Sequence, residues 1–218
     1  QHSKKTITMK NKIYVVGDAK YYASFINNSE LVSRLEDAQY VLFTGGEDVT
    51  PSLYGEKAHP STYNNLERDI QEKEIFDKMT PSQIAIGVCR GAQFLCVMNG
   101  GKLIQDVRNH AIYGTHPIID SATENVYEIT STHHQMQYPY KLPTGCYKIL
   151  MYSVEQGYRH TGLSLSEDEF FQLVKYEPEI VLYTQPGKPK CLAIQGHPEV
   201  MNPEAPIIKK INEIIETL

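Results

Sequence analysis

Short apolar runs alternate with amphipathic stretches through the first half of the chain. The runs end in or contain glycine, as buried strands of an α/β sheet often do, and the stretches place apolar residues at helical spacing. An alternation of strand and helix predicts a parallel sheet covered by helices. The predicted order is strand 13–17, helix 20–36, strand 40–46, helix 66–79, strand 83–88 and helix 89–98.

The second half has a different pattern. Its apolar runs at 126–130, 147–152 and 179–183 are not separated by long helical stretches, which predicts a mixed or antiparallel extension of the sheet. Residues 191–195 form another buried strand, and 203–218 place isoleucines on one face of a last helix. The polar segment 155–168 has no readable pattern, and the role of 155–189 stays open.

Composition narrows the class of protein. The 218 residues are 41% hydrophobic with a net charge of −5, which fits one catalytic domain over 10–218 and gives no basic surface for nucleic acid. No run approaches the roughly 20 apolar residues of a membrane span. Residues 1–9 have no apolar signal-peptide core, and are interpreted as a vector-derived remnant or a disordered start.

The four cysteines, at 89, 96, 146 and 191, include no C-x-x-C pair. They are interpreted as free thiols of a reducing compartment, and with the absent signal peptide they predict a cytoplasmic protein. Cys96, Cys146 and Cys191 are expected in the core.

Cys89 is the exception. It stands where a predicted buried strand turns into a helix, between Gly87 and Gly91, which is the setting of a nucleophile elbow. The helix N-terminus favours a thiolate and offers free N–H groups to an oxyanion. The alternative is a buried structural cysteine, and the strand–Gly-x-Cys-x-Gly–helix pattern favours the nucleophile.

A thiol nucleophile needs a base, and Gly196-His197-Pro198-Glu199 provides one at the end of another predicted strand. His197 would take and return the proton, while Glu199 orients the imidazole and stabilises its charged form.

These motifs resemble the class I, triad-type glutamine amidotransferase superfamily, whose marks are Gly-x-Cys-x-Gly-x-Gln, here residues 87–93, and Gly-x-His-Pro-Glu. Within it the chain is similar to the gamma-glutamyl hydrolase branch, which includes gamma-glutamyl-gamma-aminobutyrate hydrolase. The additional motifs are 45–55, the helix start with Arg68 and Asp69, Arg90 after the cysteine, and Ser131-Thr132-His133-His134-Gln135.

The resemblance implies a flavodoxin-like three-layer fold, a triad of Cys89, His197 and Glu199, and a gamma-glutamyl thioester intermediate. It also implies that the backbone amides of Gly46 and Arg90 form the oxyanion hole. Neither a metal nor another cofactor is expected.

Two further motif residues, Gln93 and His134, have implied roles in the pocket. Gln93 matches a position that contacts the glutamyl group, and His134 is either a pocket residue or part of a polar loop pair. Adjacent His133 and His134 would point to opposite faces of an extended segment, which disfavours a metal site made by these two.

Several charged residues have structural interpretations. Arg68 can pair with Glu72 four residues later, and with Asp69 they are expected to hold the loop at 45–55. Arg90 is expected to pair with one of these carboxylates, and Asp48 to serve turn chemistry.

The predicted function is hydrolysis of a gamma-glutamyl amide, either glutamine or a gamma-glutamyl amine, with release of glutamate and ammonia or an amine. One alternative is a glutaminase that passes ammonia to a separate synthetase subunit. Another is a catalytically silent binding or regulatory subunit. The amine and the oligomeric state stay open, with a homodimer among the alternatives.

Overall fold

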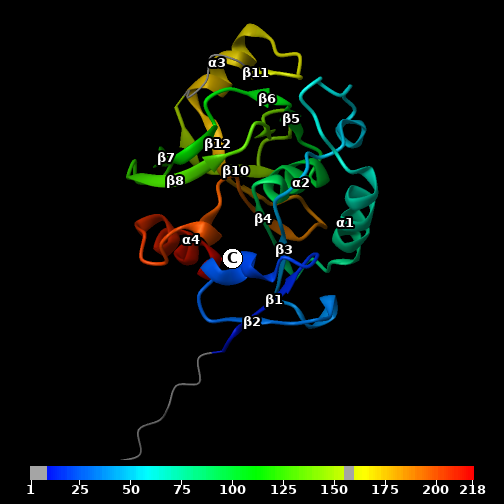
Figure 1. The fold of residues 1–218 in the computed structure, drawn as a ribbon, viewed down its shortest axis with the longest axis vertical. Helices are drawn as coiled ribbons and strands as arrows, with labels where there is room; N and C mark the ends of the chain where they lie inside the picture. The colour runs from blue at the N-terminus through cyan, green and yellow to red at the C-terminus, as the bar shows by residue number, and fades with distance from the viewer. Residues whose placement is uncertain (1–8, 155–159) are drawn as a thin grey trace, which may run out of the picture.

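A nine-stranded mixed sheet organises the protein, for which a computed structural model describes residues 9–154 and 160–218 (Figure 1). Its strand order is β2-β1-β3-β4-β13-β12-β10-β7-β8. The first five strands in this order are parallel: β2 (Ser29–Leu31), β1 (Asn11–Val15), β3 (Tyr40–Phe43), β4 (Ile84–Val88) and β13 (Lys190–Ile194).

The other four strands are antiparallel and extend the sheet beyond β13: β12 (Glu177–Tyr183), β10 (Tyr147–Ser153), β7 (Ala111–Asp120) and β8 (Val126–Thr132). The predicted mixed α/β fold is confirmed. The antiparallel part is larger than the sequence indicated, because it provides nearly half of the strands.

Helices cover both faces of the sheet. Helix α4 (Pro206–Glu216) lies on one face, and α1 (Leu66–Lys78) and α2 (Arg90–Met98) lie on the other, as Figure 1 shows. Two separate apolar cores result, one beneath α4 and one beneath α2. The predicted helices at 66–79, 89–98 and 203–218 are therefore present with bounds shifted by a few residues.

Short elements complete the structure. Helix α3 (Glu167–Lys175) begins with a capping box at Ser166 and Glu169. The short strands are β5 (Lys102–Ile104), β6 (Asp106–Val107), β9 (Met136–Tyr138) and β11 (His160–Thr161), and the 3-10 helices are η1 (Lys20–Phe25), η2 (Leu35–Asp37), η3 (Pro51–Tyr54) and η4 (Pro198–Val200).

The predicted helix at 20–36 is wrong. The segment contains η1, edge strand β2 and η2. Asn28 has a left-handed φ of 52°, which ends helical geometry, and the next residue, Ser29, pairs with Asn11 of β1. Pairing with the sheet overrides the helical spacing of the apolar side chains.

All four cysteines are free thiols, as predicted. Cys96 and Cys191 are fully buried in the core, whereas Cys146 is half-buried, so its predicted core position is wrong. Across residues 9–154 and 160–218, no helix is both long enough and apolar enough to cross a membrane. Of the proposed remnant at 1–9, residues 1–8 lie outside the described residues, as do residues 155–159.

Candidate active site

Cys89 occupies a strained turn between β4 and α2. Its φ of 54° and ψ of −111° are rare for a residue with a side chain. The glycines on either side make the turn sterically feasible, because a Cβ at Gly91 would overlap the carbonyl of Phe43 and one at Gly87 would overlap the backbone of Gly91. The predicted strand, tight turn and helix are present, with Cys89 at the N-cap of α2.

His197 lies next to Cys89 because their strands are neighbours. β4 and β13 pair in parallel, with Val88 opposite Ile194, and the Cys89 amide donates to the Ile194 carbonyl at 2.8 Å. The loop after β13 then carries His197 back to the thiol, whose proximity raises the pKa of the imidazole. Sequence-distant residues thus meet at the carboxyl end of the parallel strands.

Glu199 holds the other side of the imidazole. His197 Nδ1 lies 2.6 Å from Glu199 Oε1, and the Glu199 side chain is almost fully buried. This contact leaves Nε2 as the nitrogen that can exchange a proton with the thiol. The predicted three residues therefore form one connected chain of side chains.

The protonation of His197 follows from these contacts. Burial lowers the pKa of the imidazole, but the hydrogen bonds and charges of Cys89 and Glu199 outweigh it and raise the pKa to about 10. The imidazole is therefore protonated at neutral pH.

Thr130 and Tyr22 lie against His197, although no sequence motif predicted this. Thr130, at the end of the antiparallel half, accepts a hydrogen bond from the His197 amide at 2.8 Å. The rings of Tyr22 and His197 lie 6.2 Å apart, and burial, followed by the charge of Glu199, raises the pKa of the Tyr22 hydroxyl. No local motif marks either residue, because both belong to segments far from the triad in sequence.

The loop after β3 forms one wall of the site. Gly46 has a φ of 135°, and a Cβ there would overlap the guanidinium of Arg68. Arg68 donates to the Gly45 carbonyl and to Glu47, each at 2.9 Å, and also binds Glu72 at 2.9 Å. The predicted pairing of Arg68 with Glu72 is confirmed, and it fixes this loop to α1.

Arg90 belongs to the same buried network. Its guanidinium forms ion pairs with both Asp69 and Glu72, and all three side chains are almost fully buried. Asp69 also accepts a hydrogen bond from the Thr50 amide at 2.8 Å. The predicted pairing of Arg90 is confirmed. Arg90 also lines the pocket, and its backbone amide, the first of α2, has no partner within that helix.

An open pocket of about 160 Å³ lies beside Cys89. Gln93 is a wall residue whose amide donates to the Gln135 carbonyl at 3.0 Å. The lining combines the β3 loop, the start of α2 and the segment after β8: Gly46, Glu47, Asp48, Tyr63, Cys89, Arg90, Gln93, Thr132, His133, His134 and Gln135.

His134 and Asp48 contact each other in the lining of this pocket. His134 Nε2 lies 3.0 Å from Asp48 Oδ1, and this hydrogen bond raises the pKa of the imidazole. The other Asp48 oxygen accepts from the Tyr63 amide at 2.9 Å, so Asp48 has a loop contact as well as a pocket contact. His133 also lines the pocket but is buried, whereas the side chain of His134 is 40% exposed.

Comparisons with known proteins point to one family. The profile of the family described as Peptidase C26 matches residues 15–142. A glutamine amidotransferase-like protein, the YvdE homologue of Lactococcus lactis subsp. cremoris, is 38% identical over 69 residues, which are 31% of this chain and 37% of that protein. The chain spans about a third of the length of the curated relatives it matches.

Solved structures share the fold. A glutamine amidotransferase from Thermotoga maritima superimposes with a TM-score of 0.51 and 16% identity, over 96% of this chain and 95% of that one. A Thermoplasma acidophilum protein described as part of a GMP synthase superimposes with a TM-score of 0.56 and 15% identity, over 96% and 99% of the two chains.

Proposed function

Because the chain belongs to the peptidase C26 family of amide-bond hydrolases and amidotransferases, we propose that it hydrolyses gamma-glutamyl amides with Cys89 as the nucleophile. The position of Cys89 beside His197, at a strained turn next to an open pocket, supports this function most directly. The products are glutamate and either ammonia or an amine.

The first half-reaction forms a thioester. The Cys89 thiolate attacks the amide carbon, and the negative charge that develops on the carbonyl oxygen is stabilised by the backbone amides of Gly46 and Arg90. His197 then donates its proton to the departing nitrogen as the carbon–nitrogen bond breaks. The buried Arg68 and Arg90 network supports this step by keeping the Gly46 loop in place before substrate binds.

The second half-reaction releases glutamate. Water attacks the thioester carbon, His197 accepts the proton from that water, and the carbon–sulfur bond breaks to regenerate the thiolate. Glu199 keeps the imidazole oriented and stabilises its charge in both steps.

The pocket charges suit a glutamyl group. We assign the recognition of the α-carboxylate to His134, whose imidazole pKa is raised by Asp48, and the recognition of the α-ammonium to Asp48. Gln93 lines the same pocket as Cys89 and these two residues.

The decisive experiment assays the purified chain with glutamine and with a panel of gamma-glutamyl amines. We expect release of glutamate with at least one of them, and Cys89→Ala should lower turnover by at least about 1,000-fold. Cys146→Ala is the matched control, because that thiol is half-buried and distant in sequence from the site. Retained turnover in Cys89→Ala would refute the nucleophile.

The same assay separates the alternatives. Turnover that begins only when a synthetase subunit is added would favour ammonia transfer to a partner. A chain with no turnover under either condition, whose Cys89 also resists a glutamine-like electrophile, would be a binding subunit instead of an enzyme. Labelling of Cys89, and not of Cys146, is the result expected for either enzyme.

A further inference from the structure

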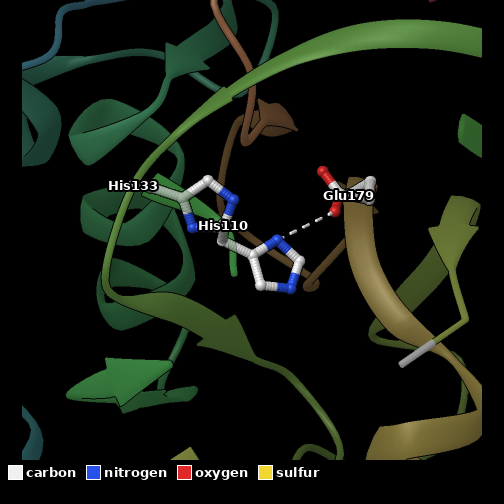
Figure 2. A group of neighbouring side chains, drawn as sticks. All are labelled: His110, His133 and Glu179. Carbon is white, nitrogen blue, oxygen red and sulfur yellow. Dashed lines mark ion pairs between the residues drawn. The ribbon is translucent and has the colours of Figure 1, made fainter. Parts of the chain in front are cut away.

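Two histidines and a glutamate converge in the interior behind one wall of the pocket. Figure 2 shows His110, His133 and Glu179 pointing toward one another. Each offers one nitrogen or oxygen atom, and these atoms lie within 4.8 Å of one another. All three residues are buried, with exposed fractions of 0%, 3% and 0%.

Strand pairing brings the three together. Ala111 of β7 lies opposite Thr132 of β8 in an antiparallel ladder, so the flanking residues His110 and His133 also lie opposite each other. Their rings are 4.8 Å apart. Glu179 comes from β12, and His110 Nδ1 lies 3.8 Å from its Oε1 atom.

Hydrogen bonds fix the tautomers of both histidines. His133 Nδ1 lies 2.7 Å from the Gln135 carbonyl oxygen, which can only accept, so this nitrogen carries the proton. His133 Nε2 therefore presents a lone pair, and it has no hydrogen-bond partner among the described residues. His110 Nε2 lies 3.0 Å from a Glu177 carboxylate oxygen, and His110 Nδ1 lies 3.5 Å from the Ser131 hydroxyl and 3.8 Å from Glu179 Oε1.

This is the arrangement found around bound metal ions. A ligating histidine usually donates its second N–H to a carbonyl or a carboxylate, which orients the ring and raises its basicity. Here His133 has the carbonyl partner and His110 has the carboxylate partner. Glu179 Oε1 accepts from the Ser153 hydroxyl at 2.9 Å and lies 3.4 Å from His116 Nε2, whereas Oε2 has no hydrogen-bond partner among the described residues.

We propose that His110, His133 and Glu179 bind a divalent transition metal of the zinc class, with the fourth position open to water. Two imidazoles and one carboxylate are a ligand set that suits zinc. Tetrahedral coordination places ligand atoms about 3.3 Å apart, so the side chains move closer by about an ångström or two when the ion binds.

The position gives the metal a structural role next to the active site. His133 and Gln135 also line the pocket, and the Gln135 carbonyl accepts from both His133 and the Gln93 amide. An ion on His133 Nε2 would hold this segment in place without contacting Cys89. The inference stands apart from the proposed reaction, because metal binding can be measured without turnover.

The test measures zinc bound by the full chain. The protein is stripped with a chelator, unfolded and refolded with Zn²⁺ or with Mg²⁺, and dialysed, and its metal content is measured by mass spectrometry. We expect one Zn²⁺ per chain, no Mg²⁺, and a higher Tm for the zinc-loaded protein. His133→Gln and Glu179→Gln should lose the ion, whereas the control His59→Gln, outside the cluster, should keep it.

X-ray absorption of the zinc-loaded wild-type chain provides a test that needs no variant. We expect a spectrum that shows two histidine ligands, with oxygen atoms as the other ligands. Absence of bound zinc after refolding, retention of zinc by both cluster variants, or a spectrum with sulfur ligands would overturn the proposal.

Discussion

At the scale of single residues, the protonation of His197 contributes to the free energy of unfolding. Burial disfavours a charge on His197, yet its contacts with Cys89 and Glu199 raise its pKa to about 10. A raised pKa in the folded state means that the folded chain binds the proton more tightly than the unfolded chain does. The protein therefore gains stability from this proton only where the ring is charged.

The expected pH dependence has a definite sign. The contribution is fully present below the ordinary histidine pKa near 6.5 and is lost as pH rises through about 10. Urea unfolding of the wild-type chain and of His197→Gln at several pH values measures it. We expect the stability advantage of the wild type to shrink between pH 6.5 and 10, and a constant difference would contradict the assignment.

Arg90 provides a second prediction at this scale. Arg90→Met leaves the buried carboxylates of Asp69 and Glu72 without their shared cation, which should destabilise the fold by about 3–5 kcal/mol. Arg34→Met is the control, because the ion pairs of Arg34 are exposed, and it should change stability by less than about 0.5 kcal/mol. Equal losses in thermal or urea unfolding would argue against the buried network.

At the scale of elements, the sequence pattern predicted those strands and helices whose buried side consists of apolar residues. The β4 strand, the Cys89 turn and α2 could be predicted because buried apolar residues and obligatory glycines adjoin one another. β7 could not, because its inward positions include His116 and Asp120, buried polar residues that read as exposed in the sequence.

The site shows the same division. Cys89, His197 and Glu199 stand in short motifs, so their chemistry can be inferred from neighbours in sequence. Tyr22 and Thr130 contact the triad only through tertiary packing, and no local pattern distinguishes them.

The turn at Cys89 makes a prediction about its supporting glycines. Gly91→Ala places a methyl group into the Phe43 carbonyl and should cost about 1–3 kcal/mol or more, with loss of activity as Cys89 shifts. Gly114→Ala, where a Cβ meets open space, should be nearly neutral. Thermal unfolding and turnover of the two variants compare them, and an unaffected Gly91→Ala protein would show that the approach is not tight.

At the scale of the whole molecule, two cores on opposite faces hold the sheet between α4 and the α1–α2 layer. Helix α4 is held by its buried isoleucines and by Lys210, which pairs with Asp120 of β7 at 2.9 Å. The last helix thus connects the end of the chain to the antiparallel half.

The contribution of buried α4 side chains to stability can be measured by truncating them. Ile211→Ala removes a fully buried side chain and should destabilise the protein by about 2–5 kcal/mol. Ile214→Ala, at a partly exposed position of the same helix, should cost clearly less. Urea unfolding distinguishes the two, and equal costs would mean that α4 does not pack through Ile211.

The two strands that carry the thiol and the imidazole are neighbours in the sheet, yet every strand from β5 to β12 is inserted between them along the chain. An exchange of the segment between Gly100 and Lys188 would therefore replace the pocket wall that contains His134 and Gln135, while Cys89 and His197 would stay on retained, adjacent strands.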